Sequence, residues 1–176
     1  LRGQQRFEET IGYYEQAAEL LQQMGDLYHW SVVQMNLGIS FNQFGKPEIA
    51  LNHYTTASSI SHNIMDAFHQ ARLSLNIAVS LLALAHFPNA ESKFQEAIQL
   101  YSQIGSKAWR LNAMDGLAMT YIGWQKFDQA IQILQQALVE LPAVLDAPNY
   151  PYLFRSLHQH WEEAHKKLHG NSHRPC

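Results

Sequence analysis

Four histidines near the C-terminus are the residues of this sequence that most invite a metal site. They are His158, His160, His165 and His169. His165 and His169 are spaced i, i+4, so a helix would place them on one face. Zinc needs three or four converging ligands, usually with cysteine or carboxylate among them. The one cysteine, Cys176, is the last residue, and Glu162 and Glu163 fit an ordinary helix surface. We therefore predict a polar helix face and no metal site.

Catalytic motifs are missing from the sequence as well. It contains no glycine-rich phosphate loop, no nucleophile elbow, no Cys/His pair and no His-Glu-x-x-His stretch. Paired carboxylates occur at Glu8 and Glu9 and again at Glu162 and Glu163, but adjacent residues point in different directions around a helix. We predict no catalytic residue, no cofactor and no enzymatic activity.

Charge and composition narrow the classes of partner. The formal net charge is −3 and Lys and Arg form no cluster, which argues against nucleic acid or a membrane surface as the main partner. Apolar residues make up 47% and charged residues 15%, so the chain can bury a continuous core. No apolar run reaches the roughly 18 residues of a membrane-spanning helix. The lone terminal cysteine fits a reducing compartment, and we expect a cytoplasmic protein.

The elements that must position any functional residue recur with a period of forty. The stretch from Met35 to Ala57, MNLGISFNQFGKPEIALNHYTTA, returns in kind forty and then eighty residues later. Small residues repeat at Gly38, Ala78 and Ala118, at Ala50, Ala90 and Ala130, and at Ala57, Ala97 and Ala137. Larger apolar residues stand three and four positions away, which predicts amphipathic helices that approach one another closely at the small residues.

Each repeat is typical of a helical hairpin. The first helices are expected at 27–44, 67–84 and 107–124. Pro47 and Pro88 fit the first turn of the second helices, where backbone N–H groups lack partners. Gly25 and Gly105 suit the left-handed residue that follows a helix C-terminus. One column of residues can cap the next helix, namely Asp26, Asp66, Ser106 and Asp146.

These features predict an all-α fold, a right-handed superhelical solenoid of antiparallel helix pairs. It would hold one partial pair, three full pairs and a C-terminal capping helix in a single domain. We expect that domain over 1–168, with repeats at about 1–25, 26–65, 66–105 and 106–145, a capping helix at 149–168 and a loose tail at 169–176. Gly3 to Ile11 lines up with Gly123 to Ile131, so the first helix, at about 7–23, would lack most of its partner. We expect the native protein to extend further towards the N-terminus.

The columns resemble the tetratricopeptide family, whose pattern is Trp-x2-Leu-Gly-x2-Tyr, then Ala-x3-Phe, then Ala and Pro. The matching residues of the first full copy are Leu37, Gly38, Phe41, Ala50, Tyr54 and Ala57. The leading Trp is not kept, and the period of forty exceeds the usual 34. Forty-residue repeats with such segments are similar to arrays of kinesin light chains, of bacterial regulators with signalling ATPase modules and of cell-polarity adaptors. The resemblance implies an array that binds proteins or peptides, or holds a neighbouring domain.

In such a superhelix the first helix of each pair would line a concave groove. The predicted groove residues are Val32, Met35, Asn36, Ile39 and Asn42, then Arg72, Leu75, Asn76, Val79 and Leu82, then Asn112, Asp115, Gly116, Met119 and Ile122. Their apolar members suit an amphipathic helix or an extended apolar segment. Asn36 and Asn76 repeat at one position and could bond a peptide backbone. Alternatively, the long helices bury these residues against a neighbouring turn or a dimer mate.

We therefore predict a protein–protein or peptide interaction module that binds its partner in this groove. It would be the C-terminal part of a larger regulatory or scaffold protein. Two alternatives stay open. In the first, the array is a sensor in a bacterial signalling ATPase or transcriptional regulator, where it binds an effector or docks a neighbouring domain. In the second, the chain forms a homo-oligomer through the uncovered N-terminal helix. No residue set in the sequence is specific enough to name a partner.

Overall fold

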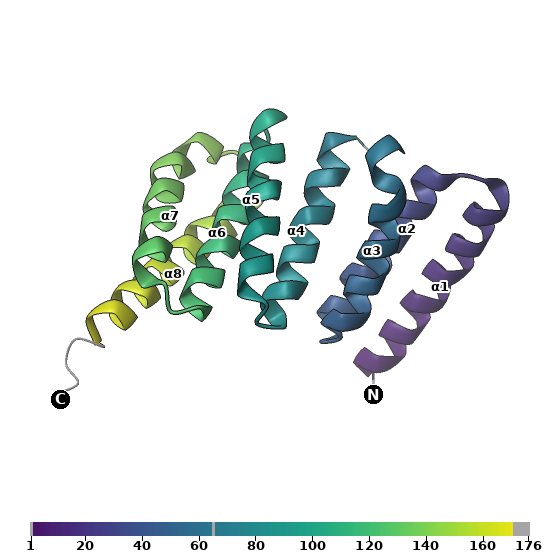
Figure 1. The fold of residues 1–176 in the computed structure, drawn as a ribbon, viewed down its shortest axis with the longest axis horizontal. Coiled ribbons are helices and arrows are strands. Elements are labelled where there is room, and N and C mark those ends of the chain that lie inside the picture. The colour runs from purple at the N-terminus through teal and green to yellow at the C-terminus, as the bar shows by residue number, and fades with distance from the viewer. Residues whose placement is uncertain (1, 65, 171–176) are drawn as a thin grey trace.

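The computed structural model describes residues 2–64 and 66–170, and this part holds eight α-helices and no strand. The helices are α1 (Arg2–Met24), α2 (Leu27–Gln43), α3 (Pro47–Ile64), α4 (Ala67–Ala83), α5 (Phe87–Gln103), α6 (Lys107–Gly123), α7 (Phe127–Glu140) and α8 (Tyr150–Gly170), with a 3-10 helix η1 (Leu141–Val144) after α7. They follow one another along the long axis of the molecule, with α1 and α8 far apart (Figure 1).

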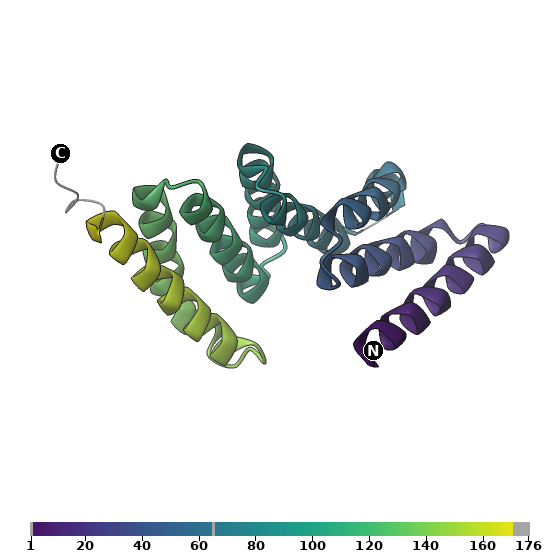
Figure 2. The ribbon, with the colours of Figure 1, turned by 90° about the horizontal axis from the view of Figure 1, so that it is seen from below.

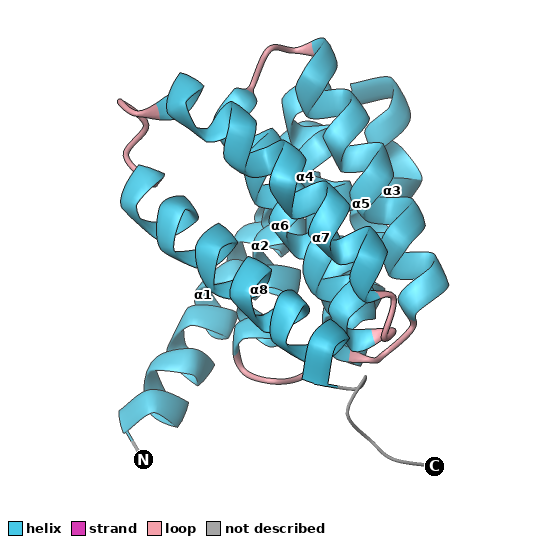
Figure 3. Cartoon of the chain, turned by 90° about the vertical axis from the view of Figure 1, so that its left-hand side faces the viewer, coloured by secondary structure: helices cyan, strands magenta, loops and turns pink. Residues whose placement is uncertain are grey.

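Consecutive helices pack as hairpins, α2 with α3, α4 with α5 and α6 with α7, and α8 then packs on both α7 and α6. Seen along the array, α3, α5 and α7 lie on one side and α2, α6 and α8 on the other (Figure 3). The predicted all-α solenoid is confirmed. The three first helices stop one residue earlier than expected because Phe44, Leu84 and Trp124 are their C-caps. The division into repeats and a single domain stays a prediction.

Small residues hold the helices of each hairpin close together. The alanine columns are fully buried at Ala50, Ala57, Ala78, Ala90, Ala97, Ala118, Ala130 and Ala137. A large apolar cluster extends from α4 through α8, and a smaller one, built around Met35 and Tyr54, joins α2, α3 and α4. Burial of apolar area is the main stabilising term in such a stack, because each hairpin is covered only by its neighbours.

Two of the four residues predicted to cap a helix do so with their side chains. Asp26 and Asp66 each accept a hydrogen bond from the backbone N–H three residues on, at 3.1 and 2.9 Å. Ser106 makes no side-chain cap bond. Asp146 is no cap at all, because α8 begins only at Tyr150. The longer connection through η1 shifts that helix start away from the period of forty.

Both ends of the array depart from the sequence expectation. Helix α1 runs unbroken from Arg2, although the period places a break just before residue 7. Hydrogen bonds from Gln4 to Glu8 and from Gln5 to Glu9 join side chains one helical turn apart across the expected break. Figure 2 shows α1 and α8 at opposite ends of the array. Of the predicted tail, residues 169 and 170 belong to α8 and 171–176 lie outside the described residues.

Candidate partner-binding surface

The predicted groove residues come from α2, α4 and α6, and the hairpin packing fixes which side of these helices is free. Gly38 of α2 faces Tyr54 of α3 so closely that a Cβ at Gly38 would lie 2.4 Å from the ring carbon Cε1. Tyr54 itself is fully buried. The residues opposite to this contact on α2, α4 and α6 are therefore the ones that can meet solvent.

Three columns of predicted residues stay accessible. Val79 and Met119 are 39% and 43% exposed, and six others are half-buried. Together these eight residues are Val32, Asn36, Ile39, Arg72, Asn76, Val79, Asn112 and Met119. In α2 and α4 they are spaced i, i+4, i+7, and in α6, where Gly116 stands at i+4, the two members are spaced i, i+7, so each set follows one line along a helix face. We call this set the stripe.

The fourth column contradicts the expected groove. Met35, Leu75 and Asp115, forty residues apart, are only 0%, 6% and 5% exposed. Met35 packs in the cluster with Tyr54, and Leu75 belongs to the large cluster. The prediction that these three residues line an accessible groove is wrong. Each of the three follows the first stripe residue of its helix by three positions, which turns its side chain towards the adjacent hairpin. The alternative expectation, burial against a neighbouring turn of the array, therefore describes these three residues.

Two further positions expected in the groove serve packing instead. Ile122 is buried in the large cluster. Gly116 receives the ring of Phe94, since a Cβ at Gly116 would lie 2.3 Å from its Cε1 atom. The two equivalent positions in the earlier repeats hold Asn36 and Asn76, so the third repeat lacks the amide of that column.

Asp115 forms a buried polar contact between α6 and α8. Its carboxylate accepts a hydrogen bond from the Ser156 hydroxyl at 2.5 Å and pairs with Nδ1 of His160 at 2.7 Å. The hydrogen bond to Asp115 raises the pKa of His160, against the opposing effect of burial. This network is not predictable from residue spacing, because Ser156 and His160 reach Asp115 only through the way α8 docks on α6.

A second polar cluster ties the starts of α2 and α4 together. His29 pairs with Asp26 at 2.8 Å and His69 with Asp66 at 2.9 Å, through Nδ1 in each case. The Tyr28 hydroxyl lies 3.2 Å from Nδ1 of His69 and so links the two helix starts. His29 and His69 therefore serve helix capping at an edge of the stripe.

The described residues contain no group of three or more His, Cys, Asp or Glu side chains able to hold a metal ion. The His165 ring lies against Trp161, with ring centroids 4.1 Å apart. Within 2–64 and 66–170, no helix has the length and apolar character to cross a membrane.

Comparison with known proteins shows which repeats part of the chain resembles. A tetratricopeptide repeat family model matches residues 69–138, which span α4 to α7. No curated protein matches the chain.

Solved structures show the same fold along the chain. The BtubC (BKLC) protein from P. vanneervenii is 15% identical with a TM-score of 0.76, and the match covers 99% of this chain and 78% of that one. A putative kinesin light chain from Podosopora anserina with nearly identical tetratricopeptide-like repeats is 14% identical, with a TM-score of 0.72 and coverage of 98% and 92%. A tetratricopeptide-like protein from Chlorobium tepidum reaches 0.60 at 15% identity, covering 76% and 92%. The expected resemblance to tetratricopeptide arrays is confirmed, and at these identities the neighbours show the fold.

Proposed function

Because residues 69–138 match a tetratricopeptide repeat model and the fold is similar to such arrays, we propose that the chain is a protein-interaction module whose partner binds along the stripe. The observation that carries the proposal is the exposure of Val79 and Met119 at equivalent positions of α4 and α6. Large apolar side chains in repeated exposed positions favour an apolar partner segment over water.

The half-buried residues beside them supply polar contacts. Asn36 and Asn76 stand at one repeat position, and Asn112 follows in the neighbouring column. An asparagine amide both donates and accepts, so it can bond the main chain of an extended segment or the polar flank of an amphipathic helix. Arg72 is the one charged residue of the stripe, which favours an acidic residue in the middle of the partner segment.

The test is a double substitution, Val79→Glu with Met119→Glu, compared with Val139→Glu. Val139 is also apolar, is 81% exposed and lies on α7 outside the stripe. We expect proteins captured from a lysate of the native cell by the parent chain to be lost with the double variant and retained with Val139→Glu. Circular dichroism checks that both variants are folded. Retention of every captured protein by the double variant contradicts the proposal.

Self-association through α1 is a second candidate. Tyr13, Leu20 and Met24 are exposed apolar residues spaced i, i+7, i+11, so they share one face of α1. Such a face suits a second copy of the helix. Sedimentation equilibrium measures the molar mass of the parent chain and of Leu20→Glu. A parent dimer that becomes a monomer on substitution supports self-association, whereas a monomer in both cases contradicts it. The sensor role and the cytoplasmic location stay predictions.

A further inference from the structure

A groove between α5 and α7, outside the stripe, resembles a ligand site. Its volume is about 360 Å³, within the range of small ligand pockets. Five glutamines line it: Gln95, Gln99, Gln129, Gln132 and Gln136. Leu117 of α6 lies at its floor. Leu117 and Met119 are two residues apart and so point about 200° apart on their helix, which places this glutamine groove on the opposite side of α6 from the stripe.

The amides of the glutamine groove are largely unused. Among the residues that the structure describes, Gln99, Gln129 and Gln132 make no side-chain hydrogen bond. Gln136 makes a long one, of 3.5 Å, to Glu140. Gln95 makes one of the same length to Glu91 and also interacts with the Tyr121 hydroxyl inside the groove. No charged side chain lines the groove. Its walls therefore offer paired donors and acceptors without charge.

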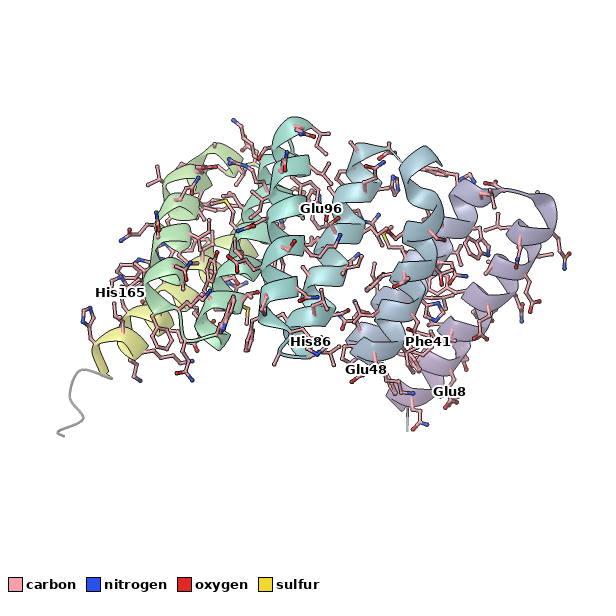
Figure 4. The ribbon with its side chains drawn as sticks, viewed as in Figure 1. Glu8, Phe41, Glu48, His86, Glu96 and His165 are labelled. Atoms are coloured by element: carbon pink, nitrogen blue, oxygen red, sulfur yellow. The ribbon has the colours of Figure 1, made fainter. Side chains whose placement is uncertain are left out.

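The repeat supplies an internal comparison. The groove between α3 and α5 occupies the equivalent place one repeat earlier, and its volume is about 50 Å³. There Lys93 pairs with Glu96 at 2.6 Å, and the Ser74 hydroxyl donates to Glu96 at 2.9 Å. Figure 4 labels Glu96 on the side of α5 that faces α4.

Two substitutions along the period of forty open the later groove. Lys93 is followed forty residues on by Ile133, and Glu96 by Gln136. The ion pair that fills the earlier groove is thus replaced by an apolar residue and an uncharged amide. Ile98 of α5 faces Ile133 across the groove, at the position where the earlier groove has Ser58.

We propose that the glutamine groove binds an extended peptide segment with aliphatic side chains and a basic residue at one end. Glutamine amides match the alternating N–H and C=O groups of a peptide main chain, and Ile98 and Ile133 take an aliphatic side chain. The charge comes from one end of the groove. There Glu91 accepts a hydrogen bond from the Tyr121 hydroxyl at 2.7 Å, and Asp128 precedes Gln129 in the first turn of α7. This site is separate from the stripe, and its occupant is independent of the partner proposed above.

The probe is the acetylated and amidated peptide Ile-Ala-Ile-Ala-Lys, titrated into protein labelled with ¹⁵N at glutamine side chains. We expect shifts confined to the amides of the glutamine groove. The double variant Ile133→Lys with Gln136→Glu restores the ion pair of the earlier repeat, and it should bind the peptide at least about tenfold more weakly, which corresponds to about 1.4 kcal/mol. Gln135→Glu is the matched control, since Gln135 is exposed on α7 outside the groove. It should bind within about twofold of the parent.

A version of the peptide with N-methylated main-chain nitrogens tests the role of the glutamines. Because it cannot donate main-chain hydrogen bonds, it should lose the glutamine shifts. The proposal is overturned if the unmodified peptide shifts no glutamine amide of the parent protein. It is also overturned if the double variant Ile133→Lys with Gln136→Glu binds the peptide as tightly as the parent protein does, or if the methylated peptide binds as tightly as the unmodified one. Shifts with maltose but none with the peptide assign the groove to a neutral sugar and also overturn it. Thermal unfolding of each variant shows that it is folded at the titration temperature.

Discussion

At the residue scale, the contact between Gly38 and Tyr54 sets the spacing of the first full hairpin. A Cβ at Gly38 would overlap the ring of Tyr54, which is fully buried. Gly38→Ala should therefore lower the free energy of unfolding, by about 1 to 3 kcal/mol as in other overpacked cores, measured by urea denaturation.

Gly12 of α1 is the control for this substitution, because a Cβ there meets nothing within 4 Å. Gly12→Ala should raise the free energy of unfolding by about 0.5 to 1 kcal/mol through better helix propensity. Equal destabilisation by both substitutions would mean that the Tyr54 contact does not decide the cost.

Single columns of residues also show how far the sequence could lead. The buried alanines and Gly38 were predictable, because a small residue at a fixed helical spacing has one common purpose, close approach. Met35, Leu75 and Asp115 were misplaced because their burial depends on how one hairpin is rotated against the next. That rotation arises from packing between repeats. It cannot be predicted by counting positions along a single helix. The glutamine groove was missed although its signal, the change from Lys93 and Glu96 to Ile133 and Gln136, lies in the sequence.

At the scale of the element, the turn after each first helix carries a backbone conformation that suits glycine. Gly45 has φ +74°, and the equivalent residues Ala85 and Gln125 have φ of 57° and 62°. The left-handed conformation costs a residue with a Cβ about 1 to 2 kcal/mol. Glycine avoids this strain, but it loses more conformational entropy on folding than alanine does, which costs up to about 1 kcal/mol. Ala85→Gly should therefore raise the melting temperature slightly, by the few degrees that about 0.5 kcal/mol gives.

The reciprocal substitution makes this prediction testable in both directions. Gly45→Ala should lower the melting temperature, since it places a Cβ at the same left-handed position. Differential scanning calorimetry of both variants measures the two shifts. A lower melting temperature for Ala85→Gly would show that chain entropy outweighs strain at this turn.

The docking of α8 should depend on pH through His160. Its pKa is raised in the folded chain by the hydrogen bond to Asp115, and Glu163 on the same helix adds to the shift. The stabilisation is fully present below about pH 6.5, the ordinary pKa of histidine, and is lost as pH rises through the raised value. The urea concentration at the unfolding midpoint should therefore decrease as the pH is raised from 6 to 8. Asp115→Asn should make this decrease smaller. A parent midpoint that does not change over this range would contradict the role of His160.

At the scale of the whole molecule, the two apolar clusters divide the array into parts of unequal stability. The large cluster runs from α4 to α8, whereas the smaller one holds α2 and α3. In a linear array each hairpin is stabilised only by its neighbours, and α1 packs against α2 at the exposed end. We expect hydrogen exchange of the backbone amides to be fastest in α1, intermediate in α2 and α3, and slowest in α5 to α7.

Two substitutions separate this gradient from unfolding of the array as one unit. Leu134→Ala removes a fully buried side chain from the large cluster, and Met35→Ala removes one from the small cluster. Each should cost about 2 to 5 kcal/mol where its cluster is disrupted. Leu134→Ala should speed exchange of the slowest amides, whereas Met35→Ala should speed exchange in α1 to α3 and leave α5 to α7 unchanged. Equal acceleration everywhere by Met35→Ala would mean that the two clusters unfold together, and the stripe and the glutamine groove would then share one cooperative unit.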